Sequence, residues 1–256
     1  MTALASLALS GGSVKDAAEQ SWPPFVLVAG LLLVGLVAER DGLFDAAAAR
    51  LASVSSSPAG LLAASLLLVA VVTAFLNLDT AAVFLTPVVI KTARARRVPT
   101  APFLYGAVFM ANASSLFLPG SNLTNLLVLS GRHASGARFA GDLFAPALAA
   151  ALLTALGLMF LHRGSLARPH RERRPTDGAM RESRPRPRSG GLAATALAAL
   201  LIVVLRDAAL PVLAVGIAAL AWRARRGEMR VGETVRAVGL PSLAGLFVLA
   251  VALGTL

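Results

Sequence analysis

The hydrophobic positions of this chain form long, nearly uninterrupted runs, unlike the one-sided stripes of a soluble amphipathic helix. Between residues 51 and 90 the only charged residue is Asp79, and between residues 98 and 131 there is none. A helix that crosses a hydrocarbon core of roughly 30 Å needs about 20 apolar residues. The pattern therefore predicts an all-α integral membrane protein. Its apolar segments are expected at 22–38, 58–76, 81–90, 102–129, 143–161, 192–205, 208–222 and 238–256.

The segment at 81–90 is too short to cross comfortably, and only the polar string from Asn77 to Thr80 separates it from the segment before it. The residues from 58 to 90 would extend about 50 Å as helix, enough for two tilted passes or for a re-entrant hairpin. Broken backbone at membrane depth is tolerated where protein or a water-filled cavity satisfies its polar groups. We therefore predict a re-entrant hairpin at about 58–91, with Asn77, Asp79 and Thr80 as binding residues at its tip. A short external turn is the alternative.

A second break is expected within 102–129, because Pro119 and Gly120 cannot propagate the helix well. Amide and hydroxyl side chains gather around this break, namely Asn112, Ser114, Ser115, Ser121, Asn122, Thr124 and Asn125. Hydrogen bonds between helices would account for such residues. Two asparagines beside a Pro-Gly step favour a coordinating loop on an unwound helix instead, and all of these residues except Ser114 are candidates for substrate or ion binding. About six further helices would cross the membrane.

Composition and charge placement agree with a membrane protein. Hydrophobic residues make up 57% of the chain, charged residues 14%, and mean hydropathy is +0.74. Nine of the 22 arginines lie between residues 163 and 188, in a hydrophilic stretch between two apolar ones, and further basic clusters occupy 91–97 and 223–236. By the positive-inside rule these stretches are cytoplasmic, which predicts a multi-pass plasma-membrane protein. The arginines lack interleaved aromatic residues, so nucleic acid is not the expected partner.

The inventory of reactive side chains excludes most enzyme classes. Cysteine is absent, and the three histidines lie at or beyond the ends of apolar segments. The chain has no phosphate-binding GxxxxGK loop, no HExxH pair and no GxSxG elbow, so neither an enzyme nor a metal site nor a bound cofactor is expected. Asp79 is the one ionisable residue deep in the hairpin region, which makes it the candidate for coupling to H⁺ or Na⁺. A simple helix cap is the alternative role for Asp79.

Four short motifs occur in order along 77–125: Asn-x-Asp-Thr from Asn77, Leu-Thr-Pro from Leu85, Ala-Asn-Ala-Ser-Ser from Ala111, and Leu-Pro-Gly-Ser-Asn-Leu-Thr-Asn from Leu118. Together they resemble the arsenite-efflux permeases (arsenical pump membrane proteins) of the ion transporter superfamily, which also contains citrate and dicarboxylate carriers. The resemblance is clear over about residues 22–162.

This resemblance implies an elevator-type secondary carrier with two inverted repeats, in which each repeat contributes one hairpin and one unwound helix to a shared site. Residues 1–162 would form the first repeat and 163–191 a basic cytoplasmic linker. Residues 192–256 would hold two connecting helices and the start of an incomplete second repeat. We therefore expect a truncated chain, a second half-transporter chain as partner, or a homodimer.

The expected activity is arsenite or small-anion efflux through the lipid bilayer. Because no Lys or Arg lies near the tip or the break, a neutral or weakly charged substrate such as arsenious acid is favoured over a strongly charged one. The alternatives are a sodium/proton antiporter, an organic-anion carrier of the same superfamily, and a non-transporting membrane subunit or remnant.

Overall fold

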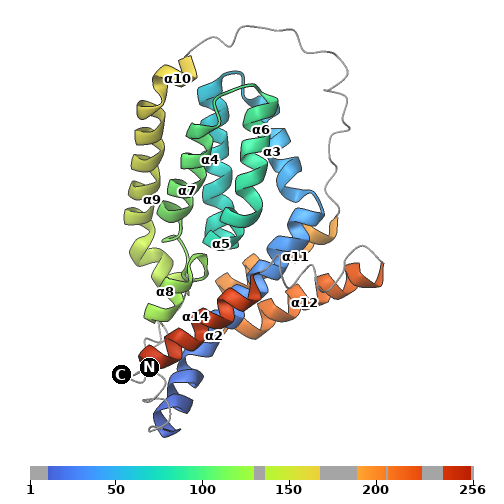
Figure 1. The fold of residues 1–256 in the computed structure, drawn as a ribbon, viewed down its shortest axis with the longest axis vertical. Coiled ribbons are helices and arrows are strands. Elements are labelled where there is room, and N and C mark those ends of the chain that lie inside the picture. The colour runs from blue at the N-terminus through green and yellow to red at the C-terminus, as the bar shows by residue number, and fades with distance from the viewer. Residues whose placement is uncertain (1–10, 130–135, 168–188, 206, 227–238, 255–256) are drawn as a thin grey trace.

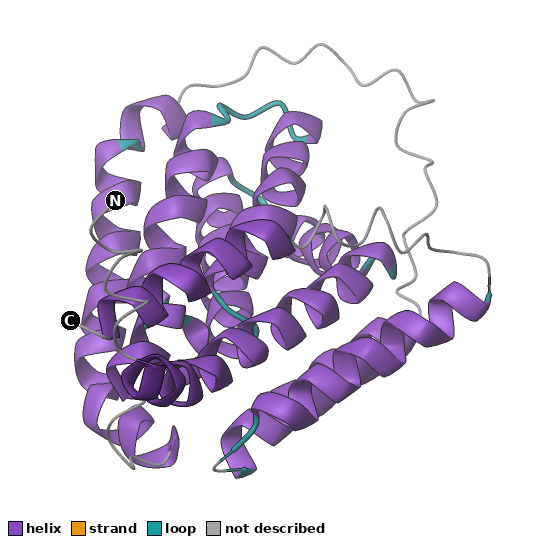
Figure 2. Cartoon of the chain, turned by 60° about the horizontal axis from the view of Figure 1, so that its bottom comes forward, coloured by secondary structure: helices purple, strands orange, loops and turns teal. Residues whose placement is uncertain are grey.

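The computed structural model describes residues 11–129, 136–167, 189–205, 207–226 and 239–254. All regular structure in these ranges is helical, as Figure 2 shows, and the expected all-α class is confirmed for them. The helices are α2 (Gly11–Arg40), α3 (Leu43–Val54), α4 (Pro58–Phe75), α5 (Leu78–Thr80), the π-helix η1 (Ala81–Leu85), α6 (Thr86–Ala95), α7 (Ala101–Ser114), the 3₁₀ helix η2 (Pro119–Ser121), α8 (Leu123–Leu129), α9 (Gly136–Leu161), α10 (Arg163–Ala167), α11 (Ser189–Val204), α12 (Ala209–Arg225) and α14 (Leu240–Gly254).

Among the described residues, three helices are long and apolar enough to span a membrane, namely Val14–Arg40, Pro58–Phe75 and Ala137–Leu161. Ser189–Val204 and Pro241–Ala252 are apolar but shorter. The outer face of α9 carries Leu152, Leu153, Leu156 and Phe160, all more than half exposed. Such a face suits contact with lipid, where apolar side chains lose nothing by exposure. The expectation of about six spans stays a prediction.

The helices form two groups, which Figure 1 shows from one side. In the first, α4, α6, α7 and α9 stand side by side, and α7 packs against the other three. In the second, α2 packs against α11, α12 and α14 and runs diagonally across the lower end of the first group. One continuous core of Leu, Val, Ala and Phe side chains joins the two groups.

Local sequence signals set the boundaries of these helices. Gly42, with φ of 73°, takes the left-handed turn between α2 and α3, a conformation that costs glycine little. Ser57 caps α4 by accepting the Gly60 N–H at 3.0 Å, and Pro58 follows at the first helical position. The Arg96 guanidinium donates to the carbonyls of Ala52 and Ser55, so a positive charge satisfies the end of α3.

Glycines allow α2 and α12 to pack backbone against backbone. A Cβ atom at Gly30 would lie 2.7 Å from the Leu213 nitrogen, and one at Gly216 would lie 2.9 Å from the Gly30 carbonyl oxygen. No larger residue fits either position without moving a helix. The two helices run in the same direction, since Gly30 lies beside Leu213 and Asp41 lies beside Arg223.

A buried ion pair fastens the end of α12 to the turn after α2. Asp41 and Arg223 are each 7% exposed, and the Asp41 carboxylate accepts from both the Arg223 guanidinium and the Gly191 N–H. The expectation that Arg223 belongs to a basic loop is therefore wrong: it lies in the last turn of α12 and is buried. The sequence around Arg223 does not indicate its partner, because Asp41 is 182 residues away along the chain. Most of the predicted 163–191 linker lies outside the described residues.

Candidate functional site at the hairpin tip

The chain reverses direction at Leu76 and Asn77, between α4 and the arm formed by α5, η1 and α6. Asn77 is extended, with φ of 170° and ψ of 175°, and its side-chain oxygen accepts the Thr80 N–H at 2.6 Å. This bond caps the returning arm, because it satisfies a donor that the first helical turn leaves without a partner. The capping role considered for Asp79 therefore belongs to Asn77.

The returning arm begins with one turn of π-helix instead of α-helix. Both the backbone N–H and the hydroxyl of Thr86 donate to the Ala81 carbonyl, the hydroxyl at 3.2 Å. Pro87 follows and has no N–H, so the preceding turn loses one helical donor. Single π-turns of this kind concentrate at functional sites. The Leu-Thr-Pro motif is therefore the local cause of an irregular turn directly after the tip.

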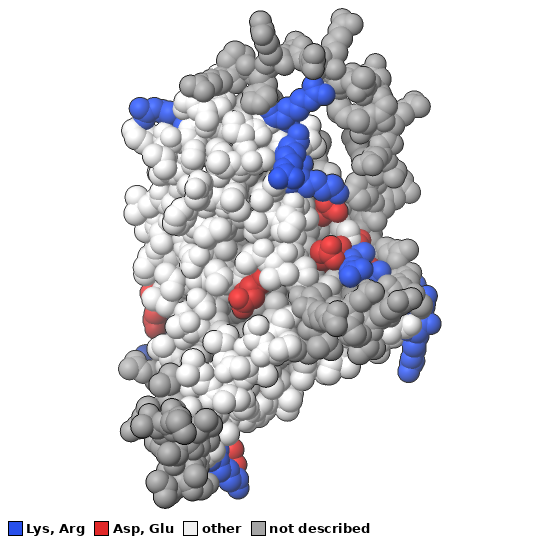
Figure 3. Space-filling model, viewed as in Figure 1, with Lys and Arg blue, Asp and Glu red and all other residues white. Residues whose placement is uncertain are grey.

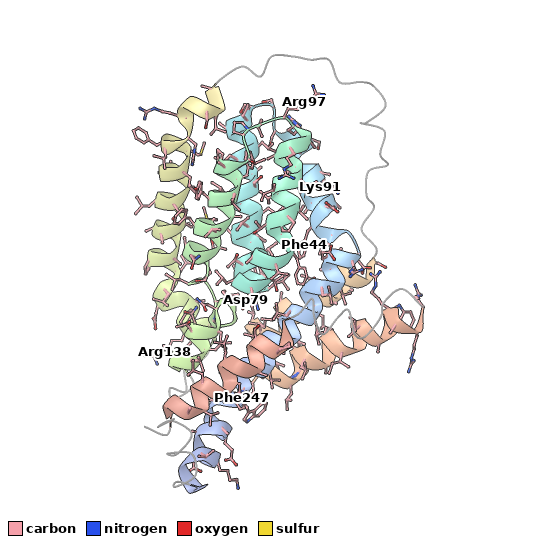
Figure 4. All side chains as sticks on the ribbon, viewed as in Figure 1. Phe44, Asp79, Lys91, Arg97, Arg138 and Phe247 are labelled. Carbon is pink, nitrogen blue, oxygen red and sulfur yellow. The ribbon has the colours of Figure 1, made fainter. Side chains whose placement is uncertain are left out.

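The tip lies against α2. Thr80 is fully buried, and its side chain packs against Gly35 of α2. A Cβ atom added at Gly35 would lie only 2.6 Å from the Thr80 methyl carbon Cγ2. Asp79 is partly exposed, and none of the described residues forms a hydrogen bond or ion pair with its carboxylate. Figure 4 labels Asp79 at the lower end of the hairpin, close to the crossing of α2. In the same view, Figure 3 shows acidic side chains as isolated groups on a largely uncharged face.

The second break runs through residues 115–122, so α7 ends before Pro119, where the sequence predicted the interruption. Its polar side chains mainly hold its own backbone. The Ser115 hydroxyl donates to the Asn112 carbonyl at 2.8 Å, and the Asn125 amide donates to the Ser115 carbonyl at 2.6 Å. The Asn122 side chain accepts the Thr124 N–H at 3.0 Å. The unwound segment is thus preorganised by Ser and Asn side chains, which satisfy groups that a helix would otherwise pair.

Ser121 connects the break to the hairpin. Its hydroxyl donates to the Ala74 carbonyl at 3.0 Å and accepts the Leu118 N–H at 3.2 Å. The helices α4 and α7 run in the same direction (Figure 1), and a Cβ atom at Gly106 would lie 2.8 Å from the Leu66 side chain, which sets Gly106 level with Leu66. With a rise of about 1.5 Å per residue, this register places Ser114 at about the level of Ala74. The break and the hairpin tip therefore meet at one end of the helix bundle.

Four buried side-chain atoms at this end have no hydrogen-bond partner: Thr73 Oγ1, Asn77 Nδ2, Thr80 Oγ1 and Ser114 Oγ. Each of these residues is 0% exposed. A buried polar group without a partner costs about 1–3 kcal/mol and needs a reason to persist. Donors and acceptors held ready for a bound solute supply that reason. Three come from the two arms of the hairpin, and Ser114 comes from the last turn of α7.

The sequence reasoning omitted Thr73 and set Ser114 aside. One signal was present for Thr73: it stands four residues before Asn77 in the sequence, the spacing that places two polar residues on one face where a helix continues. Conversely, Asn112 and Thr124 do not join the cluster. Asn112 is exposed and its amide donates to the Val108 carbonyl at 2.9 Å, and Thr124 is exposed on α8. The binding roles of all the predicted residues stay predictions.

Among the described residues, no three His, Asp or Glu side chains come together in the manner of a metal site. Comparison with known families gives one assignment. The model of the family described as citrate transporter matches residues 1–255. The chain belongs to the citrate transporter family. This member of the family is therefore a secondary membrane transporter of the citrate and ion transporter superfamily that its motifs indicated. The match does not support the narrower resemblance to arsenite-efflux permeases.

The comparison with curated proteins and the comparison with solved structures give no match. The family assignment applies to nearly the whole chain, including the residues after 162, whereas the resemblance read from the sequence was clear over about residues 22–162. In this citrate transporter family member, the hairpin tip and the break are the places where buried polar groups without partners gather.

Proposed function

We propose that this chain transports a citrate-type anion together with a cation, and that substrate and ion bind between the hairpin tip and the facing break. The observation that carries the proposal is the cluster of buried, unpartnered hydroxyl and amide groups on Thr73, Asn77, Thr80 and Ser114, at the meeting point of two interrupted helices. Interrupted helices with free polar groups are the usual way in which transporters build a site at membrane depth.

The chemistry of the cluster suits oxygen-rich solutes. Hydroxyl groups donate and accept, and the Asn77 amide nitrogen donates to a carboxylate oxygen. None of the four groups carries a charge, so a polyanion bound there has no fixed cation to balance it. A charge brought into a low-dielectric site needs a counter-charge nearby. A cation that enters with the substrate supplies it, and Asp79 next to the tip is our candidate for holding that H⁺ or Na⁺.

Arsenite is the second candidate substrate. The same lack of a fixed positive charge favours arsenious acid, a neutral molecule with three hydroxyls, and the four sequence motifs favour it as well. Both candidates place the solute at the same groups. They differ in whether transport needs an accompanying cation.

We further propose that the working transporter is plasma-membrane-embedded with its basic loops in the cytoplasm, and that a second half-transporter chain or a second copy completes the site. The hairpin and the break come from one repeat only. Inverted repeats in such carriers place two of these pairs around one substrate.

The test separates binding from transport. Purified full-length protein is titrated with citrate and with arsenite while its unfolding temperature is followed, because a ligand that binds only the folded state stabilises it by RT ln(1 + [L]/Kd). Uptake of the stabilising solute into proteoliposomes is then measured. Stabilisation by neither solute would overturn the proposed substrates, whereas stabilisation without uptake would support the need for a completing partner.

Two variants locate the site. Thr80→Val removes the hydroxyl at nearly constant volume and should weaken binding by about two- to tenfold, since one buried hydrogen bond contributes about 0.5–1.5 kcal/mol. Thr154→Val makes the same change in α9, away from the cluster, and should leave binding unchanged. Equal affinities for the two variants would move the site elsewhere.

Asp79→Asn tests the coupling. The variant should retain citrate binding but lose the dependence of uptake on an imposed proton or sodium gradient, because the amide neither releases a proton nor carries a charge. Uptake that responds to the gradients as the wild type does would remove Asp79 from the coupling role.

A further inference from the structure

A groove runs along the outer face of the returning hairpin arm, opposite the buried side of η1 and α6. It has a volume of about 450 Å³ and is lined by Ala82, Thr86, Pro87, Ile90, Lys91 and Arg94. These positions form two neighbouring rows, 82/86/90 and 87/91/94, each at intervals of three or four residues, so together they make up one broad stripe along η1 and α6. The groove is distinct from the cluster at the tip, where the polar groups are buried.

The stripe changes character along its length. From Ala82 to Ile90 it is almost wholly apolar, and the one hydroxyl, that of Thr86, is already donated to the Ala81 carbonyl. At its far end stand Lys91 and Arg94, both exposed. Figure 4 labels Lys91 well up the arm from Asp79, toward the end of the bundle that carries the basic residues. The groove therefore has an apolar part and, at one end, two positively charged side chains.

The dimensions match one leaflet of a bilayer. From residue 82 to residue 94 the stripe rises about 18 Å, and half of a hydrocarbon core is about 15 Å thick. When Lys91 and Arg94 lie at headgroup depth, Ala82 and the π-turn lie near the midplane. Lysine and arginine side chains reach toward phosphate groups from such positions.

The two basic side chains remain available to an anion. Lys91 lies 3.6 Å from a carboxylate oxygen of Asp45, but both side chains are exposed, at 72% and 41%, and an exposed pair of this kind contributes little. The neighbouring Arg96, in contrast, is engaged with the carbonyls at the end of α3. Within the part of the chain that the structure describes, no side-chain partner holds Arg94.

We propose that this groove binds one anionic phospholipid, with an acyl chain along Ala82, Pro87 and Ile90 and its phosphate between Lys91 and Arg94. The complementarity of an apolar channel to a chain, and of two adjacent cations to one phosphate, selects a lipid over a soluble anion. The bound lipid braces the returning arm directly behind the π-turn and the tip. The inference does not depend on which solute is transported.

The experiment measures lipid retention by native mass spectrometry of the full chain in mixed detergent micelles, with phosphatidylglycerol against phosphatidylcholine. Wild type should retain one phosphatidylglycerol in preference. Lys91→Gln/Arg94→Gln should lower its affinity about tenfold or more, because each basic residue near a lipid surface contributes about 1 kcal/mol. The matched control, Arg225→Gln/Arg226→Gln, removes the same charge from two exposed arginines at the end of α12 and should change nothing.

A second variant keeps the charges and fills the channel. Ala82→Phe should weaken phosphatidylglycerol retention because the ring occupies the space of the acyl chain, whereas it should leave any binding of glycerol 3-phosphate unchanged. An equal loss of phosphatidylglycerol retention in the two double variants would show general charge attraction and overturn the proposal. Binding of glycerol 3-phosphate as tight as that of the lipid would assign the site to a free anion. Cross-linking of an Ala82→Cys variant into dimers, with no retained lipid, would assign the face to a second copy.

Discussion

The contact between Gly35 and Thr80 fixes where the hairpin tip lies against α2, and a single methyl group tests it. In Gly35→Ala the new Cβ would lie 2.6 Å from the Thr80 Cγ2 and 3.0 Å from its hydroxyl oxygen. Carbon atoms in ordinary contact are about 3.5–4.0 Å apart, so the tip or α2 must move by about 1 Å. Overpacking of a well-packed interior costs about 1–3 kcal/mol, and the higher helix propensity of alanine returns about 1 kcal/mol.

We therefore expect Gly35→Ala to lower the free energy of unfolding by up to about 2 kcal/mol. Thr80→Ser removes the obstructing methyl and retains the hydroxyl, so the double variant should be no less stable than Thr80→Ser alone. Gly157→Ala is the matched control, because a Cβ there meets no atom within 4 Å. It should be neutral or slightly stabilising.

Thermal unfolding in detergent at one fixed scan rate compares the four variants with the wild type. The intrinsic fluorescence comes from Trp22 on α2 and Trp222 on α12, so it reports the helix group against which the tip packs. Equal midpoints for Gly35→Ala and Gly157→Ala would refute the packing argument. So would a double variant in which Thr80→Ser fails to restore what Gly35→Ala removes.

Three further predictions use the same unfolding assay. Gly30→Ala should lower the unfolding temperature more than Gly35→Ala does, because its Cβ would lie 2.7 Å from the backbone of Leu213. Gly141→Ala, whose Cβ meets no atom within 4 Å, should leave the unfolding temperature unchanged. Asp41→Asn should lower the free energy of unfolding by about 3–5 kcal/mol, because it leaves Arg223 buried without its carboxylate. The double variant Asp41→Asn/Arg223→Met should recover much of this loss, and additive losses would contradict a buried pair. Asn77→Ala should cost about 0.5–2 kcal/mol through the lost cap, whereas Asn77→Ser should keep a neutral capping oxygen and more of the stability; equal losses would exclude the cap.

The breaks were predictable because they depend on local chemistry. Pro119 and Gly120 interrupt a helix wherever they stand, and the polar string from Asn77 to Thr80 cannot continue an apolar one. The exact end of α7, several residues before Pro119, also has a local cause. Ser115 and Asn125 pair with the backbone that they unwind, so α7 ends several residues before the proline.

The partners of the polar residues were not predictable, because they depend on tertiary register. Asn77 and Asp79 are equivalent as capping residues in the sequence, and only the extended backbone at Asn77 decides between them. Ser121 and Ser114 are both hydroxyls on the same stretch, yet one bonds to Ala74 and the other has no partner. The sequence predicts Arg223 in a basic stretch, because no local signal indicates that Asp41 lies beside it in the fold.

The contacts of α2 define which part of the molecule is free to shift. Close packing at Gly30 and Gly216 and the ion pair between Asp41 and Arg223 tie α2 to α12 at two levels, about 16 Å apart along α2. Between these levels, Gly35 presents no side chain to Thr80. A hairpin that moves past a fixed α2 during transport must slide Thr80 across this position, and glycine offers no obstacle there. We therefore expect Gly35→Ala to reduce transport more than its effect on stability accounts for, and Thr80→Ser to restore it. If transport instead follows the folded fraction alone, the contact serves stability and the sliding movement occurs elsewhere.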